Sequence, residues 1–170
     1  MDVAALFKMS YGMYIVSSKK DEEYNAQIAN VAFQVAIEPD RIAVCINKKN
    51  YTHDLILESN VLGITVLTEE TTMEFIGKFG FKSGRDINKL EGTKYEIGTT
   101  GVPLITEFAS SVIEGKVISR MDIKEYTMFI IEVVDSKIIS KDNPMTYDYY
   151  HKVKKGKAPK TAPTYGSNNI

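Results

Sequence analysis

The sequence has few of the residues on which common metal sites and hydrolase sites depend. Its 170 residues include one cysteine, Cys45, two histidines, His53 and His151, and no tryptophan. One cysteine excludes an intramolecular disulfide, and no cysteine or histidine grouping has zinc or iron–sulfur spacing, so we expect no metal site. The chain also lacks an HExxH motif and a Gly-x-Ser-x-Gly turn. These absences argue against the common hydrolases.

An excess of charge of one sign is missing too. Twenty-one basic residues stand against 22 acidic ones, for a net charge of −1. No long-range field therefore attracts nucleic acid or an anionic membrane, and any bound anion must be held locally. The absence of tryptophan further disfavours an oligonucleotide-binding barrel.

Long apolar runs are also absent. No stretch approaches the roughly 18 apolar residues that span a bilayer, and residues 1–10 do not resemble a signal peptide. With a single cysteine, which fits a reducing compartment, we expect a cytoplasmic protein that does not bind membranes.

What the sequence does contain is typical of one globular domain, with 44% hydrophobic and 25% charged residues. Runs of β-branched and aromatic residues between turn signals predict a mainly β fold with six strands. A hairpin is expected at Glu38-Pro39-Asp40. The predicted strands span residues 11–18, 25–37, 41–47, 61–68, 110–119 and 127–139.

Helical signals are short and few. Thr52 is a candidate N-cap for a helix to about Ser59, and residues 71–74 (TTME) have capping-box spacing. From residue 142 the composition shifts to Lys, Pro, Tyr and Gly. We therefore expect a domain over residues 1–150 and an extended C-terminal tail over 151–170.

Three polar segments stand out as candidate binding elements. Residues 47–52 (NKKNYT) supply ammonium, amide and hydroxyl groups directly before a predicted helix, a pattern suited to a phosphate; a solvated loop with a helix cap is the alternative. Residues 25–34 place amides within an apolar strand, where either a heteroaromatic ring or a neighbouring loop can satisfy them. Residues 79–86 (FGFKSGRD) suit a loop over a planar ligand, or a hydrophobic anchor with a charged tip.

The glycines of this last segment match neither the dinucleotide fingerprint nor the P-loop, so a Rossmann domain is not expected. Taken in order along the chain, the segments resemble the flavin reductase-like, FMN-binding split-barrel family, especially the branch fused to rubredoxin. The matching stretches are YGMYIVSS at 11–18, NAQIAN at 25–30, NYTHDLI at 50–56, GFKSGRD at 80–86, YYH at 149–151 and APTY at 162–165.

The resemblance implies a six-stranded antiparallel split β-barrel with a few short helices that binds FMN and uses NADH or NADPH as substrate. It also implies that His151 lies near the nicotinamide. The residues that it places beside FMN are Gln27, Asn30, Phe33, Gln34, Cys45, Asn47, Lys48, Asn50, Tyr51, Thr52, Phe81, Lys82 and Ser83.

The implied function is hydride transfer from NAD(P)H to FMN, with electrons passed to rubredoxin, free flavin, ferric iron or oxygen. Rubredoxin-fused relatives carry four further cysteines for iron, so here the acceptor is expected to be a separate partner. A homodimer is also implied. Two alternatives stay open: an FMN-binding electron carrier without NAD(P)H activity, and a non-catalytic flavin-binding module.

Overall fold

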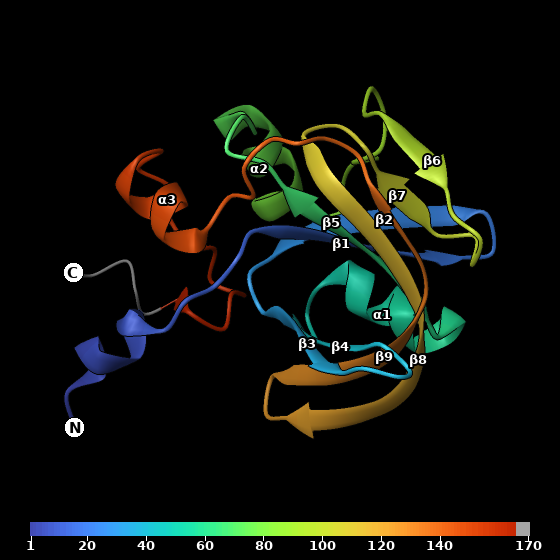
Figure 1. Ribbon diagram of the computed structural model, residues 1–170, viewed down its shortest axis with the longest axis horizontal. Coiled ribbons are helices and arrows are strands. Elements are labelled where there is room, and N and C mark those ends of the chain that lie inside the picture. The colour runs from blue at the N-terminus through green and yellow to red at the C-terminus, as the bar shows by residue number, and fades with distance from the viewer. Residues whose placement is uncertain (166–170) are drawn as a thin grey trace.

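The structure is a computed structural model in which residues 1–165 are described. Seven strands form one antiparallel sheet in the order β2-β1-β5-β8-β9-β4-β3. In Figure 1 this sheet curls around α1, with β1 and β2 above the helix and β3 and β4 below it. The strands of the sheet are β1 (Tyr14–Lys20), β2 (Glu23–Ala29), β3 (Ala32–Ala36), β4 (Arg41–Asn47), β5 (Val61–Leu67), β8 (Ala109–Ile123) and β9 (Tyr126–Ile138).

The smaller elements lie around this sheet. Strands β6 (Tyr95–Ile97) and β7 (Pro103–Ile105) pair with each other, and the helices are η1 (Val3–Lys8), α1 (Tyr51–Ser59), α2 (Met73–Gly80) and α3 (Tyr147–Lys152). Within residues 1–165 no helix is long and apolar enough to cross a membrane.

The predicted class, a mainly β barrel with a few short helices, is confirmed, but the predicted number of strands is wrong. The expected strand 25–37 is two strands, β2 and β3, because the chain turns at Asn30 and Val31. There the Asn30 side chain bonds to Thr164, and the Val31 carbonyl accepts from the Cys45 N–H at 3.1 Å. Strands β6 and β7 were not predicted, since three residues are too few to show alternation.

Several predicted boundaries also need correction. Asn50, not Thr52, is the N-cap of α1. Helix α2 is capped by Thr72, whose hydroxyl accepts from the Phe75 N–H, whereas the Thr71 hydroxyl donates to the Thr68 carbonyl. Helix α3 crosses the expected boundary between domain and tail at residue 150, and the last residues of the expected tail, 166–170, lie outside the described part of the chain. The predicted hairpin at Glu38-Pro39-Asp40 is confirmed by the pairing of β3 with β4.

Strand β1 is buried on both faces and so joins two hydrophobic cores. Ile15 packs in one core with Phe75 and Phe79 of α2 and with Tyr150 of α3. The next residue, Val16, packs inside the barrel with a second set that includes Val44, Ile56, Ile64, Phe129 and Ile131. This two-sided burial fixes β1, and through it the neighbouring strand β2.

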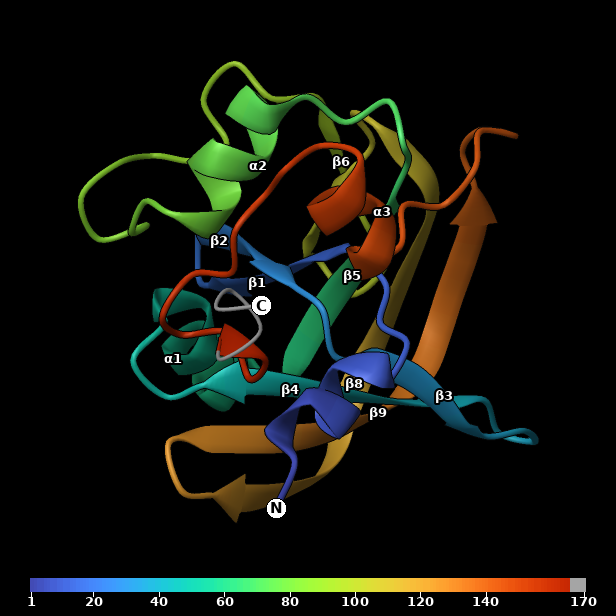
Figure 2. The ribbon, with the colours of Figure 1, turned by 90° about the vertical axis from the view of Figure 1, so that its left-hand side faces the viewer.

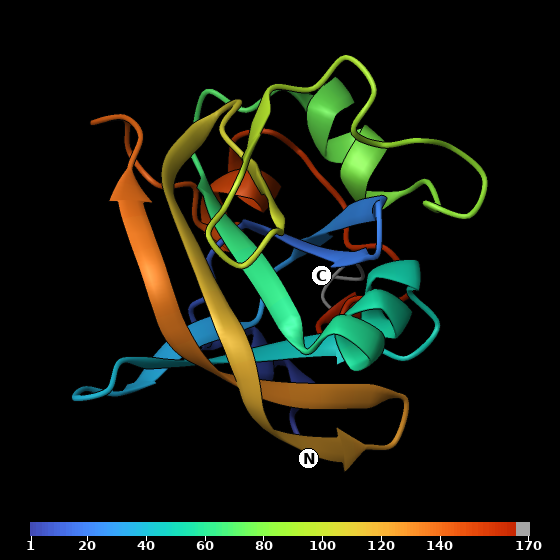
Figure 3. The ribbon, with the colours of Figure 1, turned by 90° about the vertical axis from the view of Figure 1, so that its right-hand side faces the viewer.

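Strand β2 is an edge of the sheet, since it pairs with β1 alone. In Figure 2 the chain after α3 passes in front of β2 and reaches the region of α1 and β4. Figure 3 shows the opposite side, where the long strands β8 and β9 bend around the barrel and the β6–β7 pair lies beside β8. The elements that surround β2 therefore gather on one side of the molecule.

The bend of β8 against β9 depends on Gly115, where the pairing register shifts. A Cβ there would lie 2.5 Å from the Glu132 carbonyl oxygen and 2.9 Å from Ile131 Cδ1. We expect Gly115→Ala to lower the free energy of unfolding by about 1–3 kcal/mol, measured by urea denaturation. Gly77→Ala is the control, because a Cβ on this α2 residue meets nothing within 4 Å and should stabilise by about 0.5–1 kcal/mol. Equal effects of the two substitutions would contradict this account.

Candidate functional site

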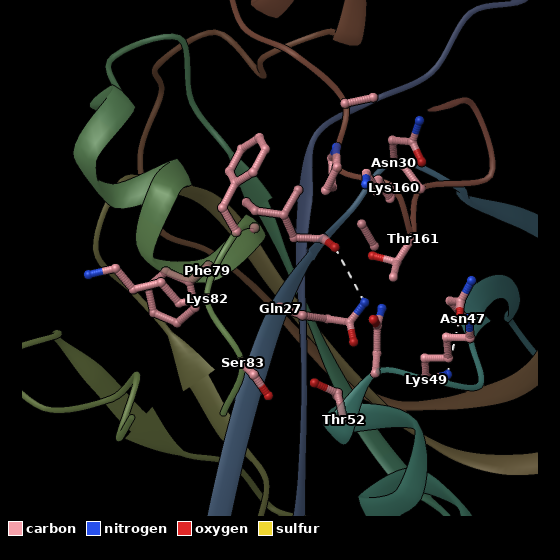
Figure 4. Close-up of a pocket in the computed structure, with 18 of the residues that line it drawn as sticks. Gln27, Asn30, Asn47, Lys49, Thr52, Phe79, Lys82, Ser83, Lys160 and Thr161 are labelled. Carbon is pink, nitrogen blue, oxygen red and sulfur yellow. Dashed lines mark hydrogen bonds between the residues drawn. The ribbon is translucent and has the colours of Figure 1, made fainter. Parts of the chain in front are cut away.

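A cavity of about 730 Å³ opens along the outer edge of β2. Four segments supply most of its lining: β2 with Asn30, the loop into α1, the end of α2 with the following residues to Gly84, and the tail between residues 157 and 165. Cys45, Lys89 and Tyr147 complete it. Figure 4 shows side chains from all four segments around Gln27. A cavity of this size falls within the range of small-molecule and cofactor sites.

The buried amide of Asn25 fixes the relative positions of three of these segments. Its Nδ2 donates to the hydroxyl of Thr52, 2.9 Å away at the start of α1, and both residues are buried. On its other side Gly84 comes so close that a Cβ would lie 2.1 Å from Asn25 Oδ1. The loop after α2 therefore needs glycine at this position in order to pack against β2.

The loop before α1 is organised by the buried side chain of Asn47. Its Oδ1 accepts from the Lys49 N–H at 2.9 Å, and its carbonyl accepts from the Asn50 N–H at 3.0 Å. Asn50 begins the helix without a capping hydrogen bond from its side chain. The side-chain amide of Asn50 and the main-chain N–H groups of Tyr51 and Thr52 at the start of α1 are thus available to an anion in the cavity, whereas the His53 N–H donates to the Asn50 carbonyl.

A second set of contacts holds this loop from outside. The Arg85 guanidinium stacks on the Tyr51 ring at 4.8 Å from its centroid and donates to the Asp54 carboxylate. A hydrogen bond with Glu23 is the main reason that the pKa of Tyr51 is raised to about 12. Tyr51 therefore keeps its proton at neutral pH.

The cavity is strongly biased toward positive charge. Of the described residues that line it, none is Asp or Glu, and five are lysines: Lys49, Lys82, Lys89, Lys157 and Lys160. In a chain with a net charge of −1, this local excess is a property of the site and not of the protein as a whole. The arrangement favours an anionic occupant.

Lys89 differs from the other lysines because it is 4% exposed. Its ammonium donates to two main-chain carbonyls, those of Ala26 on β2 and Phe79 near the end of α2, each at 3.1 Å. Burial lowers the pKa of Lys89 from 10.5 to about 8. No carboxylate among the described residues pairs with it.

Gln27 presents an unpaired acceptor beside the cavity. Its side chain is 7% exposed and its Nε2 donates weakly to the Ile28 carbonyl at 3.4 Å. The Oε1 atom is buried with no partner among the described residues. Buried acceptors normally have a donor, which an N–H or O–H group of a ligand or a water in the cavity would supply.

The tail is fixed over the site by hydrogen bonds from three different elements. The Asn30 amide donates to the Thr164 hydroxyl at 2.7 Å, and the Tyr126 hydroxyl donates to the Ala162 carbonyl at 3.2 Å. The buried Tyr150 of α3 donates to the Lys157 carbonyl at 2.9 Å. Residues 157–165 therefore form one wall of the cavity.

The sequence profile of the flavin reductase like domain matches residues 6–156, most of the chain. The chain belongs to this family. It is 47% identical over 165 residues to a ferric-chelate reductase (NAD(P)H) of Archaeoglobus fulgidus, covering 97% of this chain and 98% of that one. It is 41% identical to a high molecular weight rubredoxin of Moorella thermoacetica, covering 97% of this chain and 72% of that one.

Solved structures share the fold of this flavin reductase family member. An FMN-binding protein from Thermus thermophilus superimposes with a TM-score of 0.70 at 21% identity, covering 77% of this chain and 72% of that chain. At this identity the likeness concerns the fold alone.

The structure brings most of the residues predicted from the family resemblance to one cavity, and their contact with FMN stays a prediction. Those that line it are Gln27, Asn30, Cys45, Asn47, Asn50, Tyr51, Thr52, Phe81, Lys82 and Ser83. The half-buried Cys45 is a thiol whose pKa is raised by burial, as expected for a strand residue without a redox role.

Other predicted residues do not line the cavity. Phe33 and Gln34 lie on β3, beyond the break after Asn30, where both are exposed. Lys48 turns away to Asp122, with Nζ 3.1 Å from Oδ2, and its neighbour Lys49 lines the cavity instead. His151 packs against the Tyr147 ring and bonds through Nδ1 to the Gly156 carbonyl at 2.8 Å.

Sequence reasoning missed three lysines of the site: Lys89, Lys157 and Lys160. Lys89 lies in a polar stretch, INKLEG, whose pattern gives no sign of burial. Lys157 and Lys160 belong to a lysine-rich stretch, KVKKGKAPK at 152–160, within the predicted C-terminal tail. The small residues Gly156 and Ala158, which interrupt its lysines and are buried in the structure, were the available signal that it packs against the protein.

The burial of Lys89 predicts a specific dependence of stability on pH. Between about pH 8 and pH 10.5 the unfolded chain keeps the Lys89 proton and the folded chain loses it, so the free energy of unfolding rises with pH. Relative to Lys89→Met, the wild type should gain up to about 3 kcal/mol across this window, measured by urea denaturation at each pH. A variant of the exposed Lys82, Lys82→Met, should follow the wild-type profile. If the free energy of unfolding of wild type and of Lys89→Met changed in parallel with pH, Lys89 would not be a buried ammonium that titrates in this range.

Proposed function

We propose that this flavin reductase family member binds FMN in the cavity beside β2 and reduces it with NADH or NADPH, passing the electrons to a separate acceptor. The observation that carries the proposal is that the polar motif segments of the family lie together around one cavity. The described residues that line this cavity include five lysines and no acid. The A. fulgidus relative, at 47% identity, is named an NAD(P)H-dependent reductase.

The residues present fit the two ends of an FMN molecule. Lys49, Asn50 and the first turn of α1 would hold the phosphate, because an ammonium, an amide and a helix N-terminus meet there. The unpaired Oε1 of Gln27 would accept from an N–H or O–H group of the flavin or its ribityl chain. When bound, FMN supplies the redox chemistry, accepting a hydride from reduced nicotinamide.

This chain's own contribution is to bind, orient and shield. Asn25 keeps β2, α1 and the loop at Gly84 at fixed separation, and the tail wall limits the access of water. Lys157 and Lys160 on that wall supply positive charge on a segment separate from the phosphate turn, which suits the phosphates of a pyridine nucleotide. His151 is bonded to Gly156 through Nδ1 and does not line the cavity, so its contact with nicotinamide stays a prediction.

The acceptor is proposed from the relatives. One is named a ferric-chelate reductase and another a high molecular weight rubredoxin, so ferric chelates and a small redox protein are the acceptors to test first. We further propose that the protein acts in the cytoplasm, since its single cysteine fits a reducing compartment.

The decisive experiment is an anaerobic titration of purified protein loaded with FMN. We expect tight binding of one FMN per chain and bleaching of the oxidised-flavin absorption by NADH or NADPH, followed by recovery on addition of a ferric chelate or rubredoxin. FMN that binds but is not bleached by either nucleotide would favour an electron carrier. Failure to bind FMN would overturn the proposal.

A homodimer is proposed from an apolar surface on the outside of the barrel. The registers of β3, β4, β9 and β8 place Phe33, Met128, Ile130, Met121 and Ile123 on one face of the sheet. Phe33, Met121 and Ile123 are 52%, 60% and 42% exposed. Cys45 is on the same face and lines the cavity, so a second copy seated there would lie next to the flavin site.

The dimer is tested by sedimentation analysis. The wild type should sediment as a dimer, and Met121→Lys should sediment as a monomer, because a charge in an apolar interface lacks a partner. Ile97→Lys is the control, since Ile97 is 50% exposed on β6, outside this face. A monomeric wild type that retains FMN would exclude the dimer.

A further inference from the structure

Lys89 is a buried cation whose counter-charge is not supplied by the described part of the protein. Its ammonium donates to the Ala26 and Phe79 carbonyls, which leaves the third N–H without an acceptor among the described residues. A buried charge is costly unless it is paired, and two carbonyl dipoles compensate it only in part. Because Lys89 lines the cavity, an occupant is in position to supply the missing negative charge.

The two ends of the cavity differ in what they offer an anion. Lys89 lies at the C-terminal end of α2, through its bond to Phe79, where the helix dipole is negative. Lys49 and Thr52 lie at the N-terminal end of α1, where the dipole is positive. A phosphate dianion is therefore favoured at the N-terminal end of α1 and disfavoured at the C-terminal end of α2. With the phosphate beside α1, the ring system is the part of the ligand that lies beside Lys89.

The charge of that ring changes during the proposed reaction. Hydride transfer moves two electrons and one proton from the nicotinamide to the flavin, so the oxidised nucleotide leaves with one more positive charge and the ring gains one negative charge. Oxidised flavin is neutral and gives a buried ammonium little to pair with. A cation at the ring therefore stabilises the reduced form selectively.

We propose that the Lys89 ammonium is the charge partner of the reduced flavin ring, so that it raises the reduction potential of the bound cofactor. The inference rests on the proposed function and adds a residue that neither the family motifs nor the sequence pattern singled out. The lowered pKa of about 8 is consistent with it, because a neighbouring anion favours the protonated form of a buried ammonium.

The test compares Lys89→Met with wild type by anaerobic binding of oxidised and reduced FMN and of oxidised and reduced riboflavin, which lacks the phosphate. In the variant the affinity for reduced flavin should fall about tenfold or more relative to oxidised flavin, equally for FMN and riboflavin. Each tenfold change lowers the two-electron potential by about 30 mV. Lys89→Gln, which keeps N–H donors for the two carbonyls but no charge, should behave alike.

Lys49→Met is the matched control at the other end of the cavity. It should weaken FMN in both redox states by a similar factor and leave riboflavin binding and the potential unchanged. Loss of FMN but not riboflavin binding in Lys89→Met would assign Lys89 to the phosphate, and an equal loss in both redox states would assign it a structural role. Either result overturns the proposal.

A measurement without variants completes the test. Wild type should bind reduced riboflavin at least about tenfold more tightly than oxidised riboflavin. Equal affinities would also overturn the role of Lys89, while leaving the proposed flavin reductase function standing. Wild type that binds neither FMN nor riboflavin in either state would instead count against the proposed function itself.

Discussion

The hydrogen bond between Asn25 and Thr52 is the contact on which the geometry of the cavity depends. It joins an edge strand to the first turn of a helix 27 residues later, and both side chains are buried. Since an unpaired amide is costly there, Asn25 holds β2 and α1 at one separation. Gly84 packs against the same amide, so the loop after α2 takes its position from it as well.

The free edge of β2 explains why the site is where it is. An exposed strand edge presents unpaired N–H and C=O groups and tends to pair with other chains. Here the edge is covered by loops and by the tail, while Lys89 and Gln27 take up the carbonyls of Ala26 and Ile28. The barrel thus protects an aggregation-prone edge with the same segments that form a binding cavity. The edge is held rigidly because β1, on its other side, is buried on both faces.

The sequence allowed the three polar segments to be found because their amides, glycines and cations have no role in an ordinary strand or helix. Which residue of a pair faces the cavity could not be predicted. Lys48 and Lys49 are equivalent in the pattern; in the structure Lys48 pairs with Asp122, which is distant in sequence, and the turn held by Asn47 orients Lys49 toward the cavity. Lys89 was also beyond prediction, since its burial depends on carbonyls of β2 and α2 that only the folded chain brings together. The barrel itself was predictable, because long alternating runs identify strands whatever their partners.

The lysines also set the energetic relation between the fold and its ligand. Five ammonium groups around one cavity repel one another, and the described lining residues include no acid to offset them. Folding without a ligand therefore carries an electrostatic cost that a bound polyanion removes. A ligand that binds only the folded chain stabilises it by RT ln(1 + [L]/Kd). Ligand binding in this cavity is therefore coupled to the stability of the β2 edge. Residues 157–165, which contribute Lys157 and Lys160, take part in the same coupling.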